Sequence, residues 1–73
     1  MSKIEPRLAY KYAEIDPLDN MCIGVHTTSY DASGNPNWVE IPVYDEEYIC
    51  KYYLNGSWYE DPEGTIPWTS SML

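Results

Sequence analysis

An Asn-Gly pair between two aromatic runs is the feature that most constrains how this chain can fold. The segment reads Lys51-Tyr52-Tyr53-Leu54-Asn55-Gly56-Ser57-Trp58-Tyr59-Glu60. Asn-Gly favours a type I′ turn, because both central residues of that turn need a positive φ. Such a turn predicts a β-hairpin with the facing pairs Leu54–Ser57, Tyr53–Trp58, Tyr52–Tyr59 and Lys51–Glu60. Side chains alternate between the faces of a strand, so the two aromatic pairs lie on opposite faces. One face belongs to a core, and the other needs a covering segment or a partner.

The aromatic composition suits a thin domain or an interface. The chain has 73 residues, enough for one small domain, and it contains eight Tyr and three Trp but no Phe. Each of these rings has a polar tip that must reach water or a hydrogen-bond partner. Half-exposed faces meet that need better than a dry interior does.

The charge excludes several classes of partner. Twelve acidic residues against four Lys and Arg give a net charge of −8, which argues against binding nucleic acid or anionic membranes. Cationic surfaces remain possible partners, and solubility alone is the simpler explanation. The sequence shows neither a long apolar run nor a secretory signal pattern, so we expect a protein of cytosolic origin.

The remaining patterns predict short strands and one helical turn. Alternation indicates a strand over 10–15, and β-favouring residues indicate another over 21–30, with Gly24 marking a bulge or a close backbone approach. Residues 31–37 read as an exposed loop. A third strand over 38–44 must lie at an edge or end near Ile41, because Pro42 cannot donate to a ladder.

An N-cap residue and two acids at 45–47 predict a helical turn over 45–50. The predicted fold is therefore mainly β: a small antiparallel meander of about five strands with one short helical turn and extended N- and C-terminal arms. We divide the chain into an N-terminal arm (1–9), a single small β domain (10–60) and a C-terminal docking arm (61–73).

The C-terminal arm has a high apolar content for a segment that cannot form its own core. Its apolar residues are Ile66, Trp68, Met72 and Leu73. Either it folds back over the hairpin or it reaches a neighbouring protein, and the sequence leaves both open. We predict that truncation after Glu60 leaves a folded but less soluble or non-docking domain. Complete unfolding would show instead that Ile66 and Trp68 complete the core.

No pattern of residues supports catalysis. His26 is the only histidine, its context suggests a strand position, and no Ser or Cys is spaced to form a nucleophile with it. The acidic pairs are too small for a calcium site, and no glycine-rich phosphate loop is present. Cys22 and Cys50 have no zinc-binding spacing, and both are expected to be buried free thiols. We expect a protein that is not an enzyme and has no cofactor or metal.

The hairpin and arm hold the candidate partner-binding residues. Trp68 is of the type that anchors interfaces, and the outward aromatic rings suit a peptide or sugar platform. The predicted partner-binding set is Tyr52, Tyr53, Trp58, Tyr59, Ile66 and Trp68.

The order of short motifs along residues 10–60 resembles small modules of tailed bacteriophages, found as separate proteins or as end pieces of tail and fibre proteins. The motifs are Tyr12-Ala13-Glu14-Ile15-Asp16, Cys22-Ile23-Gly24-Val25, Val39-Glu40-Ile41-Pro42 with Tyr44-Asp45, Lys51-Tyr52-Tyr53, Asn55-Gly56 and Trp58-Tyr59-Glu60. Residues 45–50 are more acidic than that pattern, and residues 62–73 lie outside it.

The resemblance implies a non-enzymatic virion component of the tail, baseplate, fibre or head decoration. Such a protein is made in the host cytoplasm, is located in the virion, and docks on a larger virion protein in multiple symmetric copies. We expect its sheet edge and arms to make the contact.

Two alternatives come from other classes of function. An acidic inhibitor that mimics nucleic-acid charge would bind a cationic host protein with steep salt dependence, although the acids here are spread along the chain. A sugar-binding tip would use the aromatic platform, and a glycan array tests it.

Overall fold

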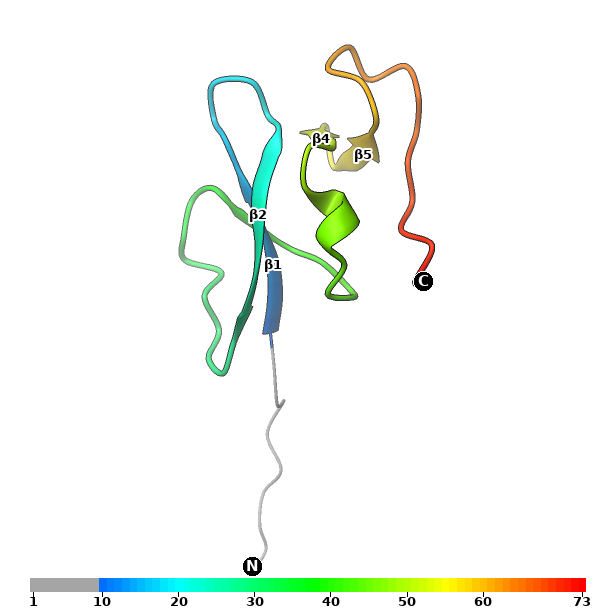
Figure 1. The fold of residues 1–73 in the computed structure, drawn as a ribbon. Helices are drawn as coiled ribbons and strands as arrows, with labels where there is room; N and C mark the ends of the chain where they lie inside the picture. The colour runs from blue at the N-terminus through cyan, green and yellow to red at the C-terminus, as the bar shows by residue number, and fades with distance from the viewer. Residues whose placement is uncertain (1–9) are drawn as a thin grey trace, which may run out of the picture.

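A computed structural model describes residues 10–73, and the predicted N-terminal arm (1–9) lies outside the described residues. Two antiparallel sheets and one 3-10 turn make up the regular structure (Figure 1). The elements are β1 (Tyr10–Ile15), β2 (Cys22–Thr28), β3 (Trp38–Glu40), η1 (Glu46–Tyr48), β4 (Tyr52–Leu54) and β5 (Ser57–Tyr59). The predicted mainly β class, with five antiparallel strands and one short helical turn, is confirmed.

The strand order corrects one detail of the predicted meander. The first sheet has the order β2-β1-β3, so the first strand is central and the next two lie on either side of it. Residues 29–37 are long enough to carry the chain from β2 to the far side of β1. The outer edge of β2 is bonded by residues 50 and 51 at Cys22, where β2 begins. As predicted, this strand is at an edge and ends before Ile41.

The β4–β5 hairpin has the predicted register. Its pairs are Tyr52–Tyr59, Tyr53–Trp58 and Leu54–Ser57, and the turn residues Asn55 and Gly56 have φ of 52° and 83°. The ladder does not extend to the predicted Lys51–Glu60 pair. Lys51 instead holds its ammonium group 4.9 Å from the ring centroid of Trp68.

Residues 50–53 join the hairpin to the first sheet. The backbone N–H of Cys22 donates to the carbonyl of Lys51, and the N–H of Cys50 donates to the carbonyl of Cys22, both at 2.8 Å. The N–H of Tyr53 donates to the carbonyl of Asn20 at 2.9 Å. At Cys50 the backbone has a φ of 77°, so the chain departs from the extended path there and covers only the beginning of β2.

The core lies between the two sheets. It is built on the side chains of one face of β1, with contributions from β2, the segment after β3, and η1. Its buried members are Ala13, Ile15, Cys22, Ile41 and Tyr48, and Tyr53, Trp58 and Trp68 pack against them. Burial raises the pKa of the Cys22 thiol, in keeping with its predicted role as a small buried hydrophobe.

The opposite face of β1 is also covered, by the loop after β2. Tyr12 is 1% exposed. Its hydroxyl accepts a hydrogen bond from the backbone N–H of Ala32 at 2.9 Å and donates to Asp31 at 3.3 Å. The loop over 31–37 is exposed as predicted except at Ala32, which is buried. Tyr12 thus ties the long connection to the sheet.

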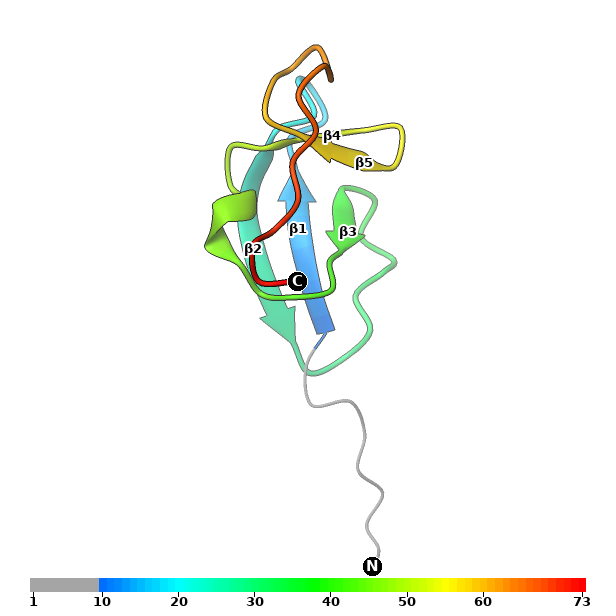
Figure 2. The ribbon, with the colours of Figure 1, turned by 90° about the vertical axis from the view of Figure 1, so that its right-hand side faces the viewer.

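The C-terminal arm folds back along β5 (Figure 2). The N–H of Glu60 donates to the carbonyl of Ile66 at 2.8 Å, and the N–H of Trp68 donates to the carbonyl of Trp58 at 3.0 Å. These bonds place residues 66–68 beside β5 as an irregular third strand. Of the two possibilities for the arm, the fold-back over the hairpin is the one present in this structure.

Candidate functional site

The six predicted partner-binding residues do not form one surface. Tyr53 and Trp58 face the core, where Trp68 joins them. Tyr52 and Tyr59 are half-buried on the other face of the hairpin, and Ile66 is 53% exposed. Their role in binding a partner stays a prediction.

The arm partly covers the outward face of the hairpin. A Cβ built on Gly64 would lie 3.0 Å from Leu54 Cδ1 and 3.7 Å from Tyr59 Cδ2. Gly64 also has a φ of 72°, which only glycine adopts at little cost. The arm therefore needs glycine here to lie close against this face.

One carboxylate fixes the shape of the arm at this point. Asp61 accepts hydrogen bonds from the N–H of Thr65 and the N–H of Ile66, both at 2.9 Å, and from the Thr65 hydroxyl. The bond from the Thr65 hydroxyl is the main cause that lowers the pKa of Asp61. The ionised carboxylate thus organises the turn that brings Gly64 against the hairpin.

A groove of about 340 Å³ lies where the arm, the hairpin and η1 meet. Its aromatic residues form one cluster: the Tyr48 ring centroid is 4.8 Å from that of Trp58 and 4.9 Å from that of Trp68, and both pairs are edge-to-face. Tyr48 is only 2% exposed, so the core holds this cluster. The groove is lined by Pro42, Tyr48, Ser57, Trp58, Pro67, Trp68, Thr69, Ser70 and Leu73.

A buried carboxylate lies next to the groove. Asp45, the predicted N-cap of η1, accepts hydrogen bonds from the Ser70 hydroxyl and from the N–H of Glu47, the latter at 2.9 Å. The Ser70 bond first, and then the Glu47 bond, lower the pKa of Asp45. The group therefore stays negatively charged at neutral pH and ties the end of the arm to η1.

The outer edge of β2 is a second candidate surface. The Ile15 N–H donates to the backbone carbonyl of Asn37 at 2.8 Å, and the Lys11 carbonyl accepts from the Ile41 N–H at 2.9 Å. The backbone N–H and C=O groups of the odd-numbered residues of β1 therefore point toward β3. On the other side of β1, in β2, Val25 faces Ala13 and Thr27 faces Lys11.

In an antiparallel ladder, facing residues direct their backbone groups either toward each other or both away. The N–H and C=O of Val25 and Thr27 therefore point out of the sheet. Within residues 10–73 no segment pairs with them.

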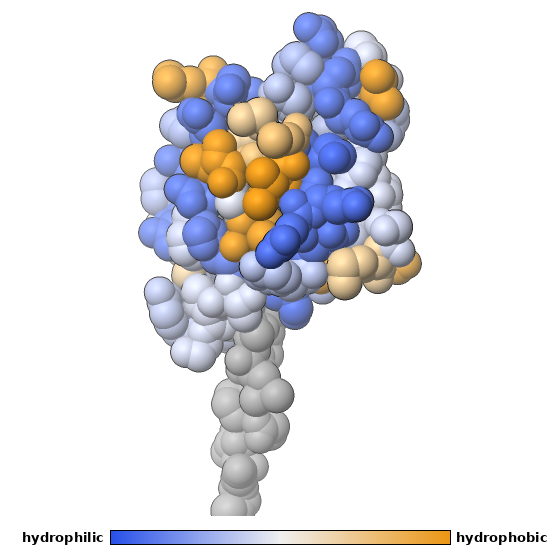
Figure 3. Space-filling view, in the orientation of Figure 1, coloured by the Kyte–Doolittle hydropathy of each residue, from blue (hydrophilic) through white to orange (hydrophobic). Residues whose placement is uncertain are grey.

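Exposed apolar side chains accompany this edge. Ile23 in β2 is 48% exposed, and Ile49, directly after η1, is 37% exposed. Figure 3 shows apolar residues gathered near the middle of the face that carries β2, ringed by hydrophilic ones. Cys50 is a free thiol but is exposed, so its predicted burial is wrong: the left-handed backbone at this residue turns it away from the core.

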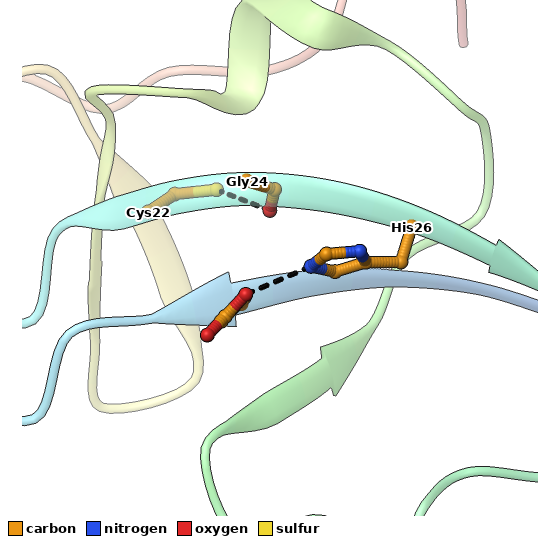
Figure 4. A network of polar contacts seen from close by, with 4 residues as sticks. Cys22, Gly24 and His26 are labelled. Carbon is orange, nitrogen blue, oxygen red and sulfur yellow. Dashed lines mark hydrogen bonds and ion pairs between the residues drawn. The ribbon is translucent and has the colours of Figure 1, made fainter.

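His26 belongs to a third cluster, on the covered face of the first sheet. Its Nε2 lies 2.8 Å from a carboxylate oxygen of Glu14, and its ring stacks on Trp38 with centroids 4.4 Å apart and planes 2° apart. Figure 4 shows the imidazole beside Gly24, where an added Cβ would lie 3.4 Å from Nε2. Among residues 10–73 no group of three or more His, Cys, Asp or Glu side chains could hold a metal ion. His26 lies in a strand, as predicted.

The part of the chain that the structure describes has no helix long and apolar enough to span a membrane. Comparison with known proteins finds no family model, no curated protein and no solved structure that matches the chain. The function must therefore be argued from the surfaces themselves.

The sequence did not reveal two parts of these surfaces. Tyr48 and Pro42 join the groove only through long-range packing, because they lie far from Trp68 in the chain. Val25 and Thr27 form an open edge because β1 is central, and residue alternation does not report strand order. The composition of residues 21–30 signals a strand but not an edge.

Proposed function

We propose that this protein is a non-enzymatic structural component of a bacteriophage particle that docks on a larger virion protein. The observation that carries the proposal is the open edge of β2 at Val25 and Thr27, with Ile23 and Ile49 exposed beside it. Exposed strand edges are templates for an added strand, and natural proteins normally blunt or cover them. A strand of the larger protein would complete both the ladder and the apolar contact.

The charge of the chain supports a basic partner. A net charge of −8 favours encounter with positively charged surfaces and keeps free copies apart. The motif resemblance to tailed-phage modules supplies the biological setting. Docking in multiple symmetric copies follows from the symmetry of such particles.

The test is incorporation into particles purified by density gradient. The wild-type protein should co-purify with them. Thr27→Pro removes one outward N–H without touching the internal ladder, and it should abolish most of the incorporation. Thr27→Val, which keeps the N–H, should incorporate normally, and circular dichroism should show both variants folded.

Particles that contain none of the wild-type chain would overturn the proposed function. Equal incorporation of the two folded variants would instead show that the β2 edge is not the docking surface.

A further inference from the structure

The groove between η1, β5 and the arm has the character of a preformed binding site. Five of its nine lining residues are aromatic or proline. The buried Tyr48 ring supports both Trp58 and Trp68, so the walls are set by core packing and need little rearrangement to receive a ligand.

The residues that line the groove carry hydrogen-bond donors. The indole N–H groups of Trp58 and Trp68 make no hydrogen bond within residues 10–73, and neither is a buried unsatisfied group. Ser57 and Thr69 add exposed hydroxyls. A polyproline II segment has free carbonyls and few N–H groups, so it needs donors of this kind.

The electrostatics around the groove favour a basic ligand. No lining side chain is charged. Asp45 carries a negative charge directly behind Ser70, and the exposed Glu46 and Glu47 follow it. Lys51 lies over Trp68 and offsets part of this charge. The balance remains acidic around η1.

We infer that this groove binds a proline-rich segment in the polyproline II conformation that carries a Lys or Arg next to its prolines. Proline rings stack in aromatic-lined grooves, and their preset backbone loses little entropy on binding. The basic side chain reaches the acids of η1. The inference rests on the proposed function in one respect: the segment belongs to the larger virion protein, and the groove is a contact additional to the β2 edge.

The test uses the isolated full-length protein and a synthetic hexaproline peptide ending in arginine. Tryptophan fluorescence should change saturably on titration, because two of the three Trp residues line the groove. A peptide with glycine in place of proline should bind at least about tenfold more weakly, and one ending in glutamate should also bind more weakly, since about 1.4 kcal/mol corresponds to tenfold in affinity.

Matched variants locate the site. Thr69→Arg places a cation on the exposed wall of the groove and should weaken binding about tenfold. Ser33→Arg makes the same change at an exposed residue of the loop after β2, which does not line the groove, and should leave the affinity unchanged.

The inference is overturned if the fluorescence change with the proline peptide does not saturate, or if the glycine peptide binds with equal affinity. It is also overturned if the two protein variants bind the proline peptide with equal affinity. It is also overturned if soluble oligosaccharides bind these Trp residues and the peptide does not. Because this titration involves no particle, its failure leaves the incorporation result standing, and the reverse holds too.

Discussion

The two sheets of the molecule are stabilised in opposite ways. The hairpin β4–β5 forms its register from a local turn, but its inward rings and its outward face depend on the arm for cover. The sheet β2-β1-β3 is assembled from segments far apart in sequence, and both faces of β1 are buried, one against η1 and the hairpin and the other by the loop after β2. Local signals thus determine which strands of the hairpin pair, whereas long-range contacts determine which surfaces stay open.

Removal of the arm should have the largest effect, because the hairpin depends on the arm on both of its faces. Truncation after Glu60 deletes Trp68 and the Ser70 hydroxyl, and exposes the Tyr48–Trp58 cluster. Loss of the half-buried Trp68 ring alone should cost about 2–4 kcal/mol, a large share of the total stability of a small domain. We therefore expect the cooperative thermal transition to disappear, in contrast to the folded truncation product that partner docking alone would predict.

Truncation after Ser70 serves as the control, because it removes only three exposed residues and should keep the transition. A truncation product ending at Glu60 that melts like the full chain would show that the arm is dispensable for folding.

Single substitutions in the arm separate its two apolar residues. Trp68→Ala should lower the free energy of unfolding by about 2–4 kcal/mol, because its half-buried ring packs on Tyr48. Ile66→Ala, at a residue that is half exposed, should cost under about 1 kcal/mol. Urea denaturation measures both, and equal costs would contradict the placement of Trp68 against the core.

A substitution in the Asn55-Gly56 turn tests whether this local turn stabilises the hairpin. Gly56→Ala forces a side chain into a φ of 83°, which should cost roughly 1–2 kcal/mol. Gly34→Ala is the matched control, because nothing lies within 4 Å of its added Cβ and its φ is not positive. That variant should be neutral or slightly stabilising, and a thermal melt compares the two.

Acid should loosen the arm before the first sheet. Asp45 and Asp61 have lowered pKa values in the folded protein, so they bind protons more readily when unfolded. Their stabilising contribution is complete above the ordinary Asp pKa of about 3.9, and it is lost as the pH falls through the lower folded values. Ser70→Ala removes the main cause of the shift at Asp45 and should weaken this dependence.

Unfolding followed by tryptophan fluorescence from neutral pH to about pH 2 measures the effect. An identical acid profile for the wild type and Ser70→Ala would contradict the role assigned to this hydrogen bond.

The sequence predicted those elements whose determinants are local. The alternation over 10–15, the turn at Asn55-Gly56 and the N-cap at Asp45 all lie where they were expected. The strand order was not predicted, because residue alternation does not report which edge of β1 a segment occupies. The exposure of Cys50 was not predicted, because it depends on a left-handed backbone at a residue that is not glycine. The groove was predicted only in part. Trp58 and Trp68 were among the predicted residues, but Tyr48, whose ring contacts both, was not, because it reaches them only through long-range packing.

Amide hydrogen exchange shows directly whether the β2 edge is the docking surface. In the free protein, Val25 and Thr27 should exchange rapidly, and His26, whose N–H points into the ladder, should exchange slowly. When the protein is bound to the larger virion protein, Val25 and Thr27 should become as protected as His26. Exchange at Val25 and Thr27 that stays rapid in the bound state would contradict docking by strand addition at this edge.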